Sequence, residues 1–98
     1  MAADKAEATV HVENERVRAT KWRFAPGEST GWHRHEYDYV VTPLTSGTVR
    51  VTGPDGQVSE ARMEAGMPYF RRAGVEHDVR SVNSEEFAFV EVGLLQQG

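Results

Sequence analysis

Short stretches of alternating apolar and polar residues cover most of the chain. Residues 9–13 and 16–24 both alternate, and Asn14-Glu15 separates them. Because successive side chains of a strand point to opposite faces, this period of two predicts β-strands. Similar stretches, each bounded by glycine, proline or other turn residues, predict further strands at residues 37–44, 48–52, 57–63, 69–70, 75–82 and 87–95.

The spacing of these stretches indicates an all-β fold. No segment shows a sustained helical period, and many short strands joined by turns are typical of an antiparallel sandwich or barrel. The 98 residues contain no linker or internal repeat. We therefore expect one domain spanning residues 1–98, with one functional site.

Histidines stand out within this strand pattern. His33 and His35 are two positions apart, so in an extended segment both rings point to the same side. His77 lies in another alternating segment, which strand pairing can bring alongside them. Three neutral imidazoles suit a divalent Fe(II), Zn, Ni or Cu ion. His11 has no neighbour at ligand spacing and is placed outside the site.

Composition narrows the chemistry. The chain has no cysteine, which removes disulfides, thiolate ligands and cysteine nucleophiles. Its net charge of −4 comes from interspersed acids and bases without a basic stripe, so nucleic-acid binding is disfavoured. Residues 1–5 do not look like a secretory signal, and no run is long enough to span a bilayer. We expect a soluble cytoplasmic protein.

Alternation also predicts which residues surround the histidines. If the strand continues smoothly from His33, its inward face receives Tyr37, Tyr39 and Val41, whereas Glu36 and Asp38 face away. Around His77 the same face receives Val75, Val79 and Ser81. Such an aromatic and aliphatic lining with a few polar groups is typical of a small-molecule pocket.

From Pro26 onward the chain resembles the cupin superfamily. The first cupin motif corresponds to residues 27–47, with Gly27 or Gly31, His33, His35 and Gly47 in place. The second corresponds to residues 66–83, with Gly66, Gly74 and His77. The resemblance implies an antiparallel double-stranded β-helix, or jelly-roll barrel, with a metal held by the three histidines. Residues 31–39 and Pro43-Leu44 look like a subgroup with members named for β-alanine degradation.

Three positions depart from these motifs. Tyr39 replaces the motif's metal-binding glutamate, Arg72 replaces a proline and Ser81 replaces an asparagine. The resulting three-histidine site looks like that of cupin thiol or diketone dioxygenases. We predict that Tyr39 is catalytic, hydrogen-bonding a water on the metal or, alternatively, ligating the metal. Glu36 or Asp38 would be a fourth ligand if a bulge breaks the alternation.

Six residues are candidates for contacting a substrate. Arg71 and Arg72 could hold a carboxylate as a bidentate fork, with surface charges as the favoured alternative. Trp22 and Phe24 are candidates for the pocket wall, with core packing as the default. The predicted set is Trp22, Phe24, Tyr37, Phe70, Arg72 and Val79.

Two functions follow. The favoured one is a metalloenzyme acting on a small anionic metabolite by dioxygenase-like oxidation, isomerisation or decarboxylation, because a single compact domain has no attached partner to which a sensor would report. The alternative is a non-catalytic metabolite-binding or sensor barrel, which the missing glutamate favours. The alternating edge at residues 8–12 predicts a homodimer.

Overall fold

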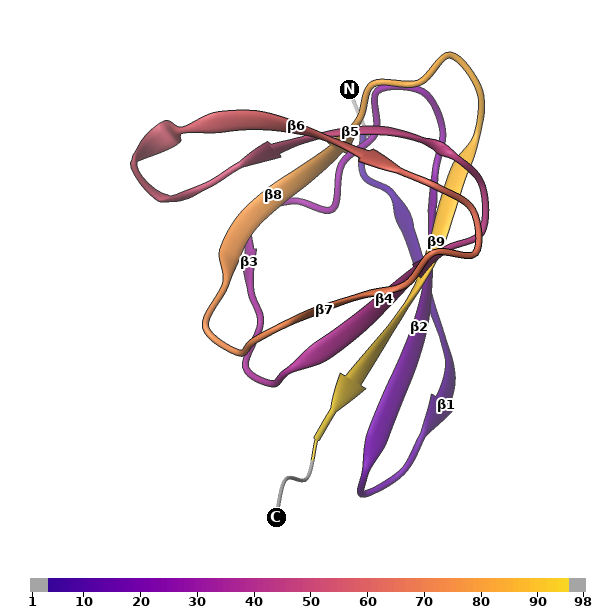
Figure 1. Ribbon diagram of the computed structural model, residues 1–98, viewed down its shortest axis with the longest axis vertical. Helices are drawn as coiled ribbons and strands as arrows, with labels where there is room; N and C mark the ends of the chain where they lie inside the picture. The colour runs from indigo at the N-terminus through magenta and orange to yellow at the C-terminus, as the bar shows by residue number, and fades with distance from the viewer. Residues whose placement is uncertain (1–3, 96–98) are drawn as a thin grey trace.

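Two antiparallel β-sheets face each other around a common core (Figure 1). The computed structural model describes residues 4–95, so residues 1–3 and 96–98 of the predicted domain lie outside the described part. The five-stranded sheet contains, in spatial order, β1 (Glu7–Glu13), β2 (Val17–Phe24), β9 (Phe87–Leu94), β4 (Tyr39–Pro43) and β7 (Tyr69–Arg71). The four-stranded sheet contains β3 (His33–Arg34), β8 (Glu76–Ser81), β5 (Gly47–Thr52) and β6 (Val58–Met63).

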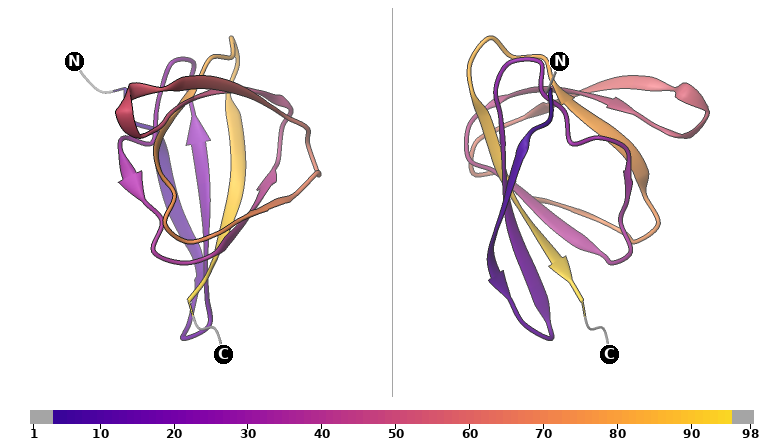
Figure 2. Two further views of the ribbon diagram at one scale, coloured as in Figure 1. Left: turned by 60° about the vertical axis from the view of Figure 1, so that its left-hand side comes forward. Right: turned by 180° about the vertical axis from the view of Figure 1, so that it is seen from behind.

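These strands confirm the predicted all-β antiparallel fold. Within residues 4–95 the only helical element is the 3₁₀ turn η1 (Pro54–Gly56), in a segment where the sequence predicts a turn. Figure 2 shows the sheets curving into a barrel, while the β1–β2 hairpin extends beyond one end. None of the helical structure in residues 4–95 has the length and apolar character needed to cross a membrane.

An aromatic cluster fills one part of the barrel core. Phe24 on β2 is fully buried, and its ring centroid lies 5.9 Å from that of Phe87 and 5.5 Å from that of Phe89. Alternate positions on β9 point inward, which is why both phenylalanines face the same interior. Val49 and Val79 from the opposite sheet complete the packing. The core therefore joins both sheets.

The chain changes sheets between the first two predicted site histidines and Tyr39. The condition of a smooth strand from His33 to Tyr39, on which the predicted lining depended, is not met: β3 ends at Arg34 and β4 begins at Tyr39. The His35 amide still donates to the Val75 carbonyl, whereas the Asp38 carbonyl accepts from Leu94 on β9. The strand breaks because its hydrogen-bonding partner changes from one sheet to the other.

Gly47, the last glycine of the first motif, lies so close to Asn83 and Phe87 that a side chain would not fit. A Cβ on Gly47 would lie 2.8 Å from both Asn83 Oδ1 and Phe87 Cδ1. Asn83 Oδ1 accepts from the Thr48 amide at 2.8 Å, and Asn83 Nδ2 donates to the Thr48 carbonyl at 2.9 Å. The absence of a side chain at Gly47 thus lets Asn83 satisfy the backbone where β5 begins.

Candidate metal centre

Strand pairing brings the three predicted histidines together. β3 and β8 pair antiparallel with His33 directly opposite His77, and directly opposed residues point to the same face. His35 follows two positions after His33 and points to that face too. Gly31 and Gly74, with φ values of +82° and +100°, make the turns that lead into these two segments.

The ring nitrogens converge on one point. His35 Nε2 lies 3.0 Å from His33 Nε2 and 3.3 Å from His77 Nε2. With metal–nitrogen bonds of about 2.0–2.1 Å and angles between octahedral and tetrahedral, ligand nitrogens stand about 2.8–3.4 Å apart. The observed spacings lie in this range, so the donor set fits a first-row divalent ion. In residues 4–95, these three histidines form the one cluster with ligand spacing.

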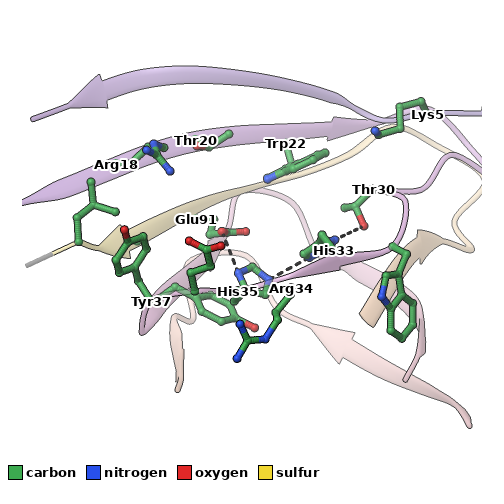
Figure 3. Close-up of a pocket in the computed structure, with 15 residues that line it drawn as sticks. Lys5, Arg18, Thr20, Trp22, Thr30, His33, Arg34, His35, Tyr37 and Glu91 are labelled. Atoms are coloured by element: carbon green, nitrogen blue, oxygen red, sulfur yellow. Dashed lines mark hydrogen bonds and ion pairs between the residues drawn. The ribbon is translucent and has the colours of Figure 1, made fainter. Parts of the chain in front are cut away.

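Hydrogen bonds at His33 Nδ1 favour the tautomer that binds metal through Nε2. His33 Nδ1 lies 2.9 Å from the Gly31 carbonyl, a pure acceptor, so Nδ1 carries the proton and donates it. The Thr30 hydroxyl lies 3.2 Å from the same nitrogen. Figure 3 shows Thr30 beside His33 and Glu91 beside His35. A proton on Nδ1 leaves the Nε2 lone pair free for a metal.

Burial keeps two of the imidazoles neutral. Desolvation, with repulsion from His33 and His77 as smaller causes, lowers the pKa of His35 to about 4. Desolvation, followed by the effect of His33, likewise lowers the pKa of His77 to about 4. Both rings are therefore unprotonated at neutral pH, as metal ligation requires.

Glu91 is a site residue that sequence reasoning missed. Its Oε2 lies 3.5 Å from His35 Nδ1, on the ring nitrogen opposite the converging Nε2 atoms. Burial raises the pKa of Glu91 to about 7, so at a pH low enough to protonate His35 the carboxyl is neutral as well. The contact is consequently not an ion pair between two charged groups; it places a carboxyl oxygen beside the His35 ring nitrogen that faces away from the cluster. The sequence did contain a signal for it: Glu91 is an acidic residue in the apolar strand β9, at a position that follows the same alternation as the inward-facing Phe87 and Phe89.

Tyr39 lies flat against His35. Their ring centroids are 3.8 Å apart and the planes differ by 15°. Burial raises the pKa of Tyr39 well above its usual value, so the hydroxyl keeps its proton across the neutral range. Of the alternative ligands, Asp38 accepts the Ala73 amide through Oδ1 at 2.8 Å, and Glu36 is exposed. Neither belongs to the histidine cluster described above.

Two cavities adjoin the histidines. An inner cavity of about 380 Å³ lies within the barrel, and an outer cavity of about 420 Å³, drawn in Figure 3, lies against β2 and β9. Some residues line both, so they form the wall between the two spaces: Thr30, His33, His35, Tyr39 and Glu91.

The predicted substrate residues separate into three groups. Trp22 and Tyr37 line the outer cavity, and Val79 lines the inner one. Phe24 lies in the core with 0% of its surface exposed, because its β2 position faces the aromatic cluster. Phe70 and Arg72 are exposed and line neither cavity, since their side chains point away from the barrel interior. Arg71, between them, is exposed as well but lines the inner cavity.

Comparisons with known proteins agree with this architecture. The family described as "Cupin domain" matches residues 20–93. The chain is 52% identical over 90 residues to the "Beta-alanine degradation protein BauB" of Pseudomonas aeruginosa, covering 92% of this chain and 94% of that protein.

Solved structures show the same barrel. A cupin domain from Bordetella pertussis is 45% identical, with a TM-score of 0.91, covering 96% of this chain and 97% of that one. A Klebsiella pneumoniae protein with a double-stranded β-helix domain is 21% identical, with a TM-score of 0.76, covering 96% and 80%. These likenesses confirm the predicted double-stranded β-helix, and the chain belongs to the cupin family.

Proposed function

We propose that this cupin binds one divalent metal ion through His33, His35 and His77 and acts as an enzyme on a small metabolite. The observation that carries the proposal is the convergence of the Nε2 atoms, at 3.0 and 3.3 Å. The hydrogen bond at His33 Nδ1 supports it, and so does the Glu91 carboxyl 3.5 Å from His35 Nδ1, because both partners lie on the ring nitrogen opposite the converging Nε2 atoms.

The cluster suits oxidation, isomerisation or decarboxylation of a metabolite. A bound ion would act as a Lewis acid or, if it were iron, as a redox centre. The chain's own groups position the reactants: Tyr39 holds the His35 ring by stacking, and side chains of both sheets line the inner cavity beside the histidines. The name of the Pseudomonas relative leads us to propose that the metabolite belongs to β-alanine breakdown.

A non-catalytic metabolite-binding barrel is the second candidate. The observation that favours it is the donor set, which within the described chain contains three histidines and no carboxylate. Such a barrel would use the same ion as an anchor for its ligand. The two candidates differ in turnover: an enzyme consumes the metabolite, whereas a binding protein returns it unchanged.

The experiment that tests the metal site is elemental analysis of untagged protein. Wild type is expected to carry about one equivalent of iron, nickel, zinc or copper, and the His33→Ala/His77→Ala double variant is expected to carry none. His11→Ala is the matched control, because His11 is exposed on β1 and lies outside the cluster. Wild type that stays metal-free after reconstitution would remove the metalloenzyme proposal.

We also propose a homodimer in the cytoplasm. β1 is the outer strand of its sheet, and every one of its residues is exposed, including Val10 and Val12. An exposed edge strand of this kind is a template for pairing with a second copy. Light scattering coupled to size exclusion is expected to give twice the 10.9 kDa chain mass, and cell fractionation tests the location.

A further inference from the structure

One exposed arginine that lines the inner cavity has no ion-pair partner within residues 4–95. Two arginines line this cavity. Arg62 pairs with Glu64, with Nε 2.9 Å from Oε2. Arg71 has no ion pair with any described carboxylate: its guanidinium lies 4.5 Å from the centroid of the Tyr69 ring, and Nη1 donates to the Phe70 carbonyl at 3.0 Å. Most of its five N–H donors are therefore available to a ligand.

Strand register directs Arg71 toward the histidines. β7 pairs with β4 so that Arg71 lies directly opposite Tyr39. Directly opposed residues of antiparallel strands point to the same face, and Tyr39 stacks on His35. The positive charge of Arg71 also contributes to lowering the pKa of His77 and opposes the rise in the pKa of Tyr39. The guanidinium thus acts on the same space as the histidine cluster.

The rest of the inner cavity is largely apolar. Aliphatic and aromatic side chains from both sheets make its wall, among them Val41, Val51, Val75, Val79 and Phe89. Its volume, about 380 Å³, lies at the small end of ligand pockets. An arginine beside a small apolar space offers one strong anion contact and room for a short carbon chain.

We propose that the inner cavity binds a small carboxylic acid, with the carboxylate on Arg71 and the short apolar body directed toward the histidines. This proposal deepens the proposed function: it rests on that function for the idea that the ligand reacts at the histidines. Arg71 is the residue that would set the substrate class, because a planar fork of N–H donors matches a carboxylate and not a neutral amide. The adjacent Arg72, exposed like Arg71, lines neither cavity and serves as the matched control.

The test compares butyrate with the uncharged butyramide. Binding to ¹⁵N-labelled protein is followed by amide chemical shifts, once with protein stripped of metal on a chelating resin and once with protein holding one equivalent of Zn²⁺. Wild type is expected to bind butyrate at least about tenfold more tightly than butyramide. Arg71→Gln is expected to weaken butyrate binding by at least about tenfold and leave butyramide unchanged, whereas Arg72→Gln keeps wild-type affinity.

Several results would overturn the proposal. Equal butyrate affinity in wild type and Arg71→Gln would do so, as would equal affinity for the two probes, or no butyrate binding at on the order of 10 mM. Butyrate binding that needs Zn²⁺ and ignores Arg71→Gln would assign the carboxylate to the ion and also refute it.

A failure of the proposed metal site can be distinguished from a failure of the Arg71 proposal. Zn²⁺ stoichiometry reports on the proposed metal function, and the metal-free titration reports on Arg71 regardless of that result. If Arg71→Gln does not fold, Arg71→Lys replaces it. This variant keeps the charge but loses the fork, so a several-fold loss of butyrate affinity is expected and unchanged affinity contradicts the assignment.

Discussion

Replacing Glu91 by glutamine is expected to change how the stability of the metal-free protein depends on pH. Burial raises the pKa of Glu91 from 4.5 to about 7 in the folded protein, whereas the unfolded chain keeps the ordinary value. Between these two pH values the folded state retains a proton that the unfolded state releases. The contribution of Glu91 to stability is therefore full below about pH 4.5 and is lost as the pH rises through 7.

The size of the effect follows from the same two pKa values. Linkage between pH 5 and pH 8 gives roughly 2.5 kcal/mol, because a tenfold change in a proton equilibrium is worth about 1.36 kcal/mol. The side chain keeps 22% of its surface exposed, so water screens part of this and we expect about 2 kcal/mol. Glutamine has nearly the same shape but cannot ionise. Glu91→Gln should therefore resemble wild type at pH 5 and be more stable than wild type at pH 8.

Urea denaturation of metal-free protein measures this difference. The free energy of unfolding of wild type and of Glu91→Gln is measured in urea at pH 5 and at pH 8. The difference between the two proteins at pH 5 is then subtracted from their difference at pH 8. Protonation of His35 and His77, whose lowered pKa values make stability rise with pH up to about 6.5, occurs in both proteins and largely cancels. The same advantage at both pH values, within about 0.5 kcal/mol, would refute the reasoning.

Three further substitutions, two of them paired with a control substitution, test other parts of the structure. Tyr39→Phe should retain its stacking and change metal affinity less than about tenfold in a competition titration with a chelator; loss of metal would make the hydroxyl a direct ligand. Phe24→Ala should cost about 3–5 kcal/mol in urea denaturation, whereas Phe70→Ala, at a side chain 47% exposed, should cost less than about 1 kcal/mol; equal costs would contradict the core assignment. Gly47→Ala should cost about 1–3 kcal/mol, because its Cβ meets neighbours at 2.8 Å, while Gly53→Ala, with no atom closer than 4.0 Å, should be nearly neutral in the same assay.

Much of the fold could be predicted because local rules decide it. Turn residues such as Asn14 act through nearby atoms: its Oδ1 accepts the Arg16 and Val17 amides at 2.8 and 2.9 Å. The convergence of His33 and His35 follows from a spacing of two residues. The position of His77 needed more than alternation, and the cupin motifs supplied it.

The sequence could not reveal features that depend on which strands become neighbours. The break between Arg34 and Tyr39 arises because the chain passes from β8 to β9 as its pairing partner. Glu91 contacts His35 only after β9 has been placed beside β4. Which of Arg71 and Arg72 faces the cavity depends on which side of β7 each side chain occupies. β7 has only three residues, which is too short a segment to show alternation in the sequence.

The pairing of His33 with His77 has a consequence for when a metal can be captured. Forty-two residues separate His35 from His77, so the cluster does not exist until a distant pair of strands has closed. Closing so long a loop costs entropy before any native contact compensates, which makes such pairings late events in folding. During synthesis, the growing chain offers an ion only the His33-x-His35 pair until residue 77 has emerged and β8 has docked. Metal selection therefore belongs to the finished barrel, where the spacing of the donors is already set.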